Sequence, residues 1–225
     1  MKSIYSMLSV LCLAILMTSC RSAYMPNVAN TPLLSEKGEA QVAIHYGTSG
    51  INPQIAYAFS DHIGAMLNAN FLKNENNDQV NNYGEIGIGY FMPFAEKGRF
   101  EVFAGYGIGD YYTHDSFKLE IPEIHSGTIN RFFIQPSIGF SSEIFEGSFT
   151  PRLVHVNVDD ISGKGSGTYL EPIITAKVGY KFIKTVFQVG LNLKIGSNNP
   201  YYLNQNPLIV SFGLQLNINQ LFNTK

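Results

Sequence analysis

The last regular segment of the chain decides the fold: residues 210–219 read VSFGLQLNIN. Every second residue from Val210 to Ile218 is apolar, and the residues between them are serine, glycine, glutamine and asparagine. Because successive side chains of a β-strand point to opposite faces, this alternation predicts a strand with one apolar and one polar surface. Residues 186–196, VFQVGLNLKIG, repeat the pattern.

Read along the whole chain, the same alternation predicts about ten strands. Strands of soluble sheets typically have about five or six residues, whereas most of the predicted strands are long enough to cross a bilayer at a tilt, which takes about 9–11 residues. The predicted strands are residues 39–47, 51–60, 63–72, 83–94, 100–112, 128–141, 149–158, 169–182, 186–196 and 207–221.

The connections between these strands alternate in length. Short turns are predicted at 60–62, 95–98, 142–148 and 183–185, and long polar loops at 73–82, 113–127, 159–167 and 197–206; only the first hairpin, at 48–50, is short where a long loop is expected. Long loops on one side and short turns on the other are typical of outer-membrane barrels, whose turns lie in the periplasm. The sequence therefore predicts an all-β fold, an antiparallel up-and-down transmembrane β-barrel, and its even strand number predicts that both termini are periplasmic.

Aromatic residues follow the same division into two ends. Phenylalanines lie beside the predicted turns or the C-terminus, at positions 59, 94, 100, 140, 149, 182, 187 and 222. Tyrosines lie beside the predicted loops, at positions 46, 83, 111, 112, 169, 201 and 202. Two aromatic girdles suit the two interfaces of a bilayer. The alternative is a soluble, lipocalin-like barrel, in which the apolar face would point inward and girdles would have no purpose.

The charge content separates the chain from nucleic-acid-binding proteins and from ordinary soluble domains. Its formal net charge is −2, and 14% of its residues are charged, against about 25% in a typical soluble domain. No stretch after the first twenty residues approaches the roughly 20 apolar residues of a transmembrane helix.

The N-terminus resembles a bacterial lipoprotein signal. Lys2 precedes an apolar core at 7–17, and Leu-Met-Thr-Ser-Cys at 16–20 resembles a lipobox. We therefore expect a signal peptide at 1–19, cleavage before Cys20, and acyl chains such as palmitate on that residue. Cys20 is the only thiol of the mature chain, so it cannot form an intramolecular disulfide. The alternative is an ordinary signal peptide with an incidental cysteine.

Residues 20–38, which contain prolines and no periodicity, are expected to form an acylated tether to a barrel domain at 39–225.

Five stretches of the mature chain resemble a family of uncharacterised barrel-like lipoproteins from Bacteroidota. They read EKGEAQVAIHYGTSGINPQIAYAFSDHIG (36–64), YGEIGIGYFMPF (83–94), GRFEVFAGYGIGD (98–110), RFFIQPSIGF (131–140) and FTPRLVHVNV (149–158). The resemblance implies an outer-membrane location and brings no activity or site. It also implies that exported lipoproteins carry acidic residues after the cysteine; Arg21-Ser22-Ala23 follow here, so the anchor is expected in the periplasmic leaflet.

The polar faces of the predicted strands carry charges of both signs. Side chains largely fill the interior of a barrel of this size, so we expect a mutually neutralising network in the lumen; the alternative is a narrow pore lined by these charges. The predicted members are Glu85, Glu101, Arg131, Arg152, Glu171, Lys177, Lys181 and Lys194.

Glycines and prolines mark irregular places in the predicted strands. Glycines 87, 89, 105, 107 and 109 share one face of two neighbouring strands, where they allow either tight curvature or a pocket for a lipid or small apolar ligand. Pro136 and Pro172 predict bulges, because proline donates no hydrogen bond to the ladder. A further bulge near Pro151 would turn Val154, Val156 and Val158 outward.

The sequence favours a structural or interaction role in the outer membrane over catalysis. The alternatives are a narrow channel, a lipid-binding barrel, or a hydrolase built on His114, Asp115, Ser116 and His125 of one long loop, whose local sequence matches no known outer-membrane hydrolase. We expect no cofactor, no metal and no nucleic acid as partner. The expected partners are the outer-membrane bilayer, the covalent lipid on Cys20 and an outer-membrane protein.

Overall fold

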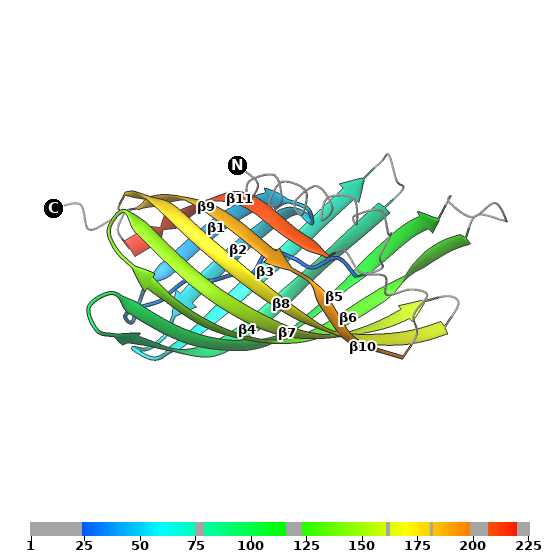
Figure 1. The fold of residues 1–225 in the computed structure, drawn as a ribbon, viewed down its shortest axis with the longest axis horizontal. Helices are drawn as coiled ribbons and strands as arrows, with labels where there is room; N and C mark the ends of the chain where they lie inside the picture. The colour runs from blue at the N-terminus through cyan, green and yellow to red at the C-terminus, as the bar shows by residue number, and fades with distance from the viewer. Residues whose placement is uncertain are drawn as a thin grey trace, which may run out of the picture.

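The computed structural model describes residues 24–74, 79–115, 123–160, 163–180, 182–198 and 207–219. The chain forms one antiparallel sheet of ten strands, which curls into a closed barrel (Figure 1). Eleven strand segments build it because the ninth strand is interrupted at Asn192 and forms both β9 and β10. The segments are β1 (Ala40–Gly47), β2 (Gly50–Ala58), β3 (Ile63–Asn74), β4 (Gln79–Phe94), β5 (Gly98–Asp115), β6 (Glu123–Ser141), β7 (Phe145–Asp160), β8 (Gly163–Tyr180), β9 (Ile183–Leu191), β10 (Leu193–Ser197) and β11 (Leu208–Asn217).

Strands that follow one another in sequence lie side by side, and the first and last strands close the ring. Ile44 of β1 is opposite Pro53 of β2 on one side and opposite Leu214 of β11 on the other. The predicted up-and-down antiparallel barrel is therefore confirmed. The described ranges contain no helix that is long and apolar enough to cross a bilayer.

The two ends of the barrel differ in the connections that they carry. The turn end carries the short connections 59–62, 95–97 and 142–144, and the loop end is the opposite one, where β3 ends and β4 begins.

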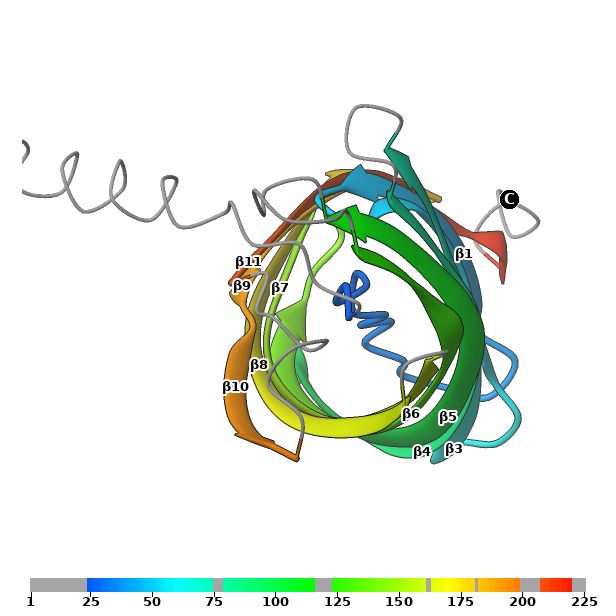
Figure 2. The same cartoon turned by 90° about the vertical axis from the view of Figure 1, so that its right-hand side faces the viewer.

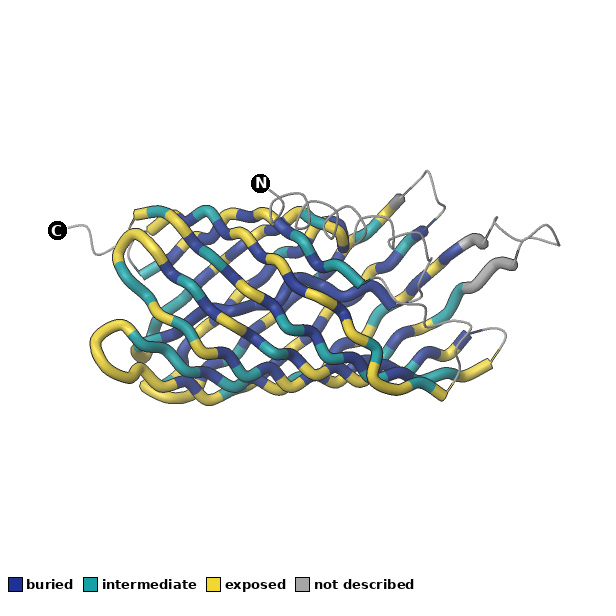
Figure 3. The backbone as a smooth tube through the Cα atoms, in the orientation of Figure 1, coloured by how far each residue is buried: buried dark blue, intermediate teal, exposed yellow. Residues whose placement is uncertain are grey.

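The alternating strands turn their apolar residues outward. In β11, Phe212 and Leu214 are exposed, whereas Ser211 and Gln215 are buried. Figure 3 shows this alternation of exposed and buried positions around the barrel. A lipocalin-like barrel needs the opposite orientation, so the soluble alternative does not describe this structure.

The apolar outer surface has a limited height. The outward residues of β8 are apolar from Leu170 to Tyr180, and Thr168, Ser166 and Lys164 continue the same face toward the loop end. Ten residues at about 3.3 Å per residue, tilted by about 40°, span about 25 Å. This matches the apolar band of about 25 Å that surrounds outer-membrane barrels.

The prolines do not produce the predicted bulges. Pro151 and Pro172 are opposite each other within an unshifted β7–β8 register, and the pairs on both sides of Pro136 keep one register. The register shift that does occur lies between Lys194 and Gly196. Val154, Val156 and Val158 point inward without any bulge, because they join an apolar cluster with Tyr24 and Tyr169 inside the barrel; the predicted outward orientation was wrong.

The aromatic girdle is clear at the turn end and was partly misassigned at the loop end. Exposed rings at the turn end belong to Tyr57, Phe59, Tyr90, Phe94, Phe140, Phe145, Tyr180 and Phe182. Tyr46 and Tyr112 are exposed toward the loop end, but Tyr83, Tyr111 and Tyr169 point into the lumen. The hydroxyl of Tyr111, for example, donates a hydrogen bond to Asp160 at 2.5 Å. Tyr83 and Tyr169 lie two residues from the inward Glu85 and Glu171, so the alternation of the strands itself indicates a luminal position, which the girdle assignment disregarded.

Candidate functional site

Residues 24–35, which we call the luminal segment, lie inside the barrel. Figure 2 shows the segment in blue within the ring of strands. It forms no helix or strand, and residues 24–34 are all buried. The irregular backbone agrees with the tether expected at 20–38, but the burial does not: this part of the tether is packed into the lumen.

The luminal segment runs along the barrel axis. The ring of Tyr24 packs against that of Tyr169, with 4.6 Å between centroids, and the Tyr83 hydroxyl donates to the Met25 carbonyl at 3.2 Å. At its other end, Leu34 lies beside Gly64, one residue from the start of β3 at the turn end. The chain thus passes from the loop-end half of the lumen to the turn end before β1 begins.

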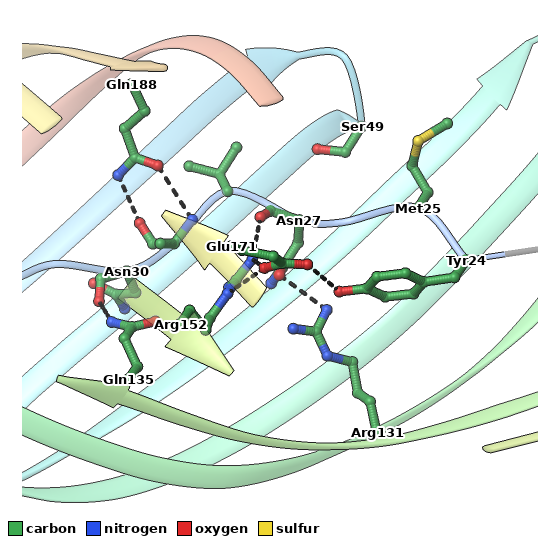
Figure 4. A network of polar contacts seen from close by, with 12 residues as sticks. Tyr24, Met25, Asn27, Asn30, Ser49, Arg131, Gln135, Arg152, Glu171 and Gln188 are labelled. Carbon is green, nitrogen blue, oxygen red and sulfur yellow. Dashed lines mark hydrogen bonds and ion pairs between the residues drawn. The ribbon is translucent and has the colours of Figure 1, made fainter. Parts of the chain in front are cut away.

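One carboxylate and one guanidinium hold the beginning of the segment. Glu171 accepts hydrogen bonds from the Tyr24 hydroxyl at 2.6 Å and from Arg152 Nε at 2.7 Å. Arg152 Nη2 also donates to the main-chain oxygen of Asn27 at 2.7 Å. Figure 4 shows these contacts converging on the segment. All three side chains are fully buried, so the charges of Glu171 and Arg152 depend on each other for neutralisation.

A second ion pair holds the Asn27 side chain. Asn27 Nδ2 donates to Glu85 Oε1 at 2.6 Å, and Arg131 Nη1 donates to Asn27 Oδ1 at 2.9 Å. Glu85 and Arg131 also contact each other at 3.2 Å. The Arg131 guanidinium lies 5.5 Å from the centroid of the Tyr24 ring and 5.2 Å from that of Tyr83, distances typical of cation–π contacts.

Amide side chains of the wall bind the backbone of the middle of the segment. Gln188 accepts from the Ala29 N–H at 3.2 Å and donates to the Ala29 carbonyl at 2.7 Å. Gln54 donates to the Val28 carbonyl at 2.8 Å and Gln135 to the Asn30 carbonyl at 2.6 Å. A buried backbone needs partners for its polar groups. Here glutamines supply them in place of a neighbouring strand.

The end of the segment meets a third charged cluster. Glu101 Oε2 accepts from the Leu33 N–H at 3.0 Å, and Lys177 Nζ donates to the Pro32 carbonyl at 3.5 Å. Lys177 also pairs with Glu146 at 3.2 Å, and Lys184 pairs with the other oxygen of that carboxylate. All of these charged side chains are buried.

Six of the eight predicted luminal charges lie buried in the lumen: Glu85, Glu101, Arg131, Arg152, Glu171 and Lys177. Lys194 is half-buried on β10, and Lys181 lies outside the described residues. Sequence reasoning missed Glu146 and Lys184, because both were assigned to turns. It also missed Asn27 and the wall glutamines. The signal that could have found them is the recurrence of inward Asn and Gln on many strands, since such side chains can bind a peptide backbone.

The inward glycines make room for rings rather than for a ligand. A Cβ on Gly105 would lie 2.6 Å from the Phe133 ring, and one on Gly89 would lie 2.5 Å from the Phe103 ring. A Cβ on Gly109 would lie 2.2 Å from Tyr83 Cβ. The space over these glycines is therefore filled by neighbouring side chains, so the alternative interpretation of a pocket for a lipid does not hold at these positions.

The lipidation site and the hydrolase candidates lie outside the part of the chain that the structure describes. Cys20 and Ser116 are outside the described residues, and so are the side chains of His114, Asp115 and His125. Within the part of the chain that the structure describes, no group of three or more His, Cys, Asp or Glu side chains could hold a metal ion.

Together, the strand order and the filled lumen define a closed, ten-stranded antiparallel β-barrel. Its outer surface is apolar, as the surface of a barrel in a lipid bilayer is. No protein-family model and no curated protein matches the chain. Among solved structures, it is similar to the N-terminal β-barrel domain of Pseudomonas aeruginosa OprF, at 10% identity and a TM-score of 0.35, over 81% of this chain and 98% of that chain.

Proposed function

We propose that the protein is an outer-membrane β-barrel lipoprotein whose own N-terminal segment closes the lumen, and that its role is structural or interactive rather than enzymatic. The observation that carries this proposal is the luminal segment: its residues 24–34 are all buried, and three charged clusters bind it to the wall.

The exterior supports a membrane location. Monomeric soluble proteins rarely expose contiguous apolar patches larger than a few hundred Å². Here Ile86 and Ile88 are 63% and 62% exposed at mid-barrel, within an apolar band that continues around the barrel. A bilayer would cover this band, and the aromatic girdle at the turn end would lie at one interface. The resemblance of residues 16–20 to a lipobox supports acylation of Cys20 as a second attachment.

The interior favours a closed barrel over a narrow channel. An ion path would have to replace the segment, which would break the bonds that Asn27 makes to Glu85 and Arg131. Each hydrogen bond to a buried charged group contributes about 1.5–3 kcal/mol, so displacing the segment is costly even though Glu85 and Arg131 remain paired. A closed lumen leaves the loop-end surface and the lipid-facing belt as the parts that can meet another outer-membrane protein.

Planar bilayer recording tests the proposal. Purified wild-type protein should insert without steady conductance, because the segment fills the lumen. A variant without residues 24–34 that retains a folded barrel should conduct and serves as the positive control. A steady single-channel conductance of the wild-type protein would overturn the closed-barrel proposal in favour of a channel.

A further inference from the structure

The luminal segment runs through the barrel once, in addition to the ten crossings made by the strands. Both Ala40 at the start of β1 and Asn217 at the end of β11 lie at the turn end, as an even number of strands requires. The luminal segment also has its C-terminal end there, with Leu34 beside Gly64. Its N-terminal end, at Tyr24, lies in the loop-end half of the lumen. The described chain therefore begins in the loop-end half of the lumen and leaves the lumen at the turn end, before β1.

Tyr24 also lies near the outer limit of the apolar band. Its ring packs on Tyr169, and the outward neighbour of that residue, Leu170, is the last apolar position of the β8 face. Eleven residues separate Tyr169 from Tyr180 at the turn end. At about 3.3 Å per residue and a tilt of about 40°, this is about 28 Å along the axis.

The chain before Tyr24 is too short to return to the turn end. Cys20 precedes Tyr24 by four residues, which reach at most about 14 Å when fully extended. Residues 25–34 already occupy the lumen along that route. The loop end of β8, at Gly163, is six residues from Tyr169, or about 15 Å by the same arithmetic.

We propose that the mature N-terminus emerges on the loop side, so that the acyl chains on Cys20 enter the outer leaflet at the cell surface. This inference rests on the proposed function, namely a membrane-spanning barrel acylated at Cys20. It reverses the expectation that the anchor lies in the periplasmic leaflet. Arg21-Ser22-Ala23 lack the acidic residues of an export signal, and a passage through the lumen makes such a signal unnecessary. The lipid and the barrel then hold the two ends of the luminal segment on opposite sides of the membrane.

Cysteine accessibility in intact cells tests this route. Cys12 leaves with the signal peptide and Cys20 is blocked by lipid, so an introduced thiol is the only reactive one. The test variant is Ser22→Cys. The matched controls are Lys164→Cys, which is exposed near the loop end, and Lys97→Cys, which is exposed in a turn. Each is treated with an impermeant maleimide before and after the outer membrane is breached.

The inference predicts that Ser22→Cys behaves as Lys164→Cys, with equal labelling before and after the breach, whereas Lys97→Cys is labelled only after it. If Ser22→Cys instead follows Lys97→Cys, the threaded route is wrong and the membrane barrel stands. If the two controls behave alike, or if the unmodified protein is labelled at Cys20, the proposed function fails. An epitope inserted between Ser22 and Ala23 gives a second readout: antibody should bind it on intact cells, and binding only after the breach overturns the inference.

Discussion

Asn27→Ala is the substitution that most sharply tests how the luminal segment is held. The side chain of Asn27 lies between Glu85 and Arg131; its amide N–H donates a hydrogen bond to Glu85, and its amide oxygen accepts one from Arg131. Alanine removes both bonds while leaving the backbone and the ion pair in place. The perturbation therefore weakens the contact between segment and wall without unpairing a charge.

The expected cost follows from the bonds that are lost and kept. A hydrogen bond to a charged group contributes about 1.5–3 kcal/mol, so two of them amount to about 3–6 kcal/mol. Glu85 keeps Arg131 at 3.2 Å and Asn68 at 3.1 Å, and Arg131 keeps the Tyr83 hydroxyl at 2.9 Å. A water molecule in the space left by the amide would also find polar partners. We therefore expect the lower end, about 3 kcal/mol of destabilisation.

The assay is urea unfolding of the protein in lipid vesicles. The folded fraction is measured by the gel mobility of the folded barrel, because the chain has no tryptophan whose fluorescence could report unfolding. Asn82→Ala is the matched control: Asn82 is exposed on the outer face of β4, so its replacement should change the free energy of unfolding by less than about 0.5 kcal/mol. If Asn27→Ala is as stable as this control, the segment is not held in the lumen as described.

Three further substitutions test other parts of the account by the same unfolding measurement. Arg152→Ala leaves the buried Glu171 carboxylate without its cation and should cost about 3–5 kcal/mol; adding Glu171→Gln should recover part of this loss, and no recovery would argue against a charge effect. Gly105→Ala would place a Cβ 2.3 Å from a main-chain oxygen and should cost about 1–3 kcal/mol, whereas Gly196→Ala, with no atom within 4 Å of its Cβ, should be neutral. Ile88→Arg on the outer face should cost about 2–4 kcal/mol in a bilayer, with Ile88→Val as its control; an unchanged stability would indicate that this face is not in lipid.

The strands could be predicted because their two faces meet different surroundings. In β9 and β11 every outward residue from Phe187 to Leu191 and from Phe212 to Leu216 is apolar, so the period of two is unbroken. The same logic failed at Val154, Val156 and Val158. These residues face inward, because the lumen has an apolar cluster of its own around Tyr24 and Tyr169. An apolar residue is then compatible with either face.

The luminal segment could not be predicted from periodicity, because its backbone forms neither helix nor strand. Its partners are side chains that are distant in sequence: Ala29 and Gln188 are 159 residues apart. Glu146 was placed in a turn, although its carboxylate pairs with Lys177 and Lys184 inside the barrel. The predicted charges of the wall indicated that the lumen is filled, but only the closed barrel shows that the chain itself fills it.

The most direct test of the central claim is amide hydrogen exchange of residues 24–35 in the barrel reconstituted into lipid. The N–H groups of Val28, Ala29 and Leu33 donate to Asn52, Gln188 and Glu101 inside the wall. A segment held by these bonds exchanges only when it leaves the lumen or the barrel opens. The account predicts that peptides from this segment are protected as strongly as those from β1 and β11. Exchange within seconds, as in a free tail, would contradict it.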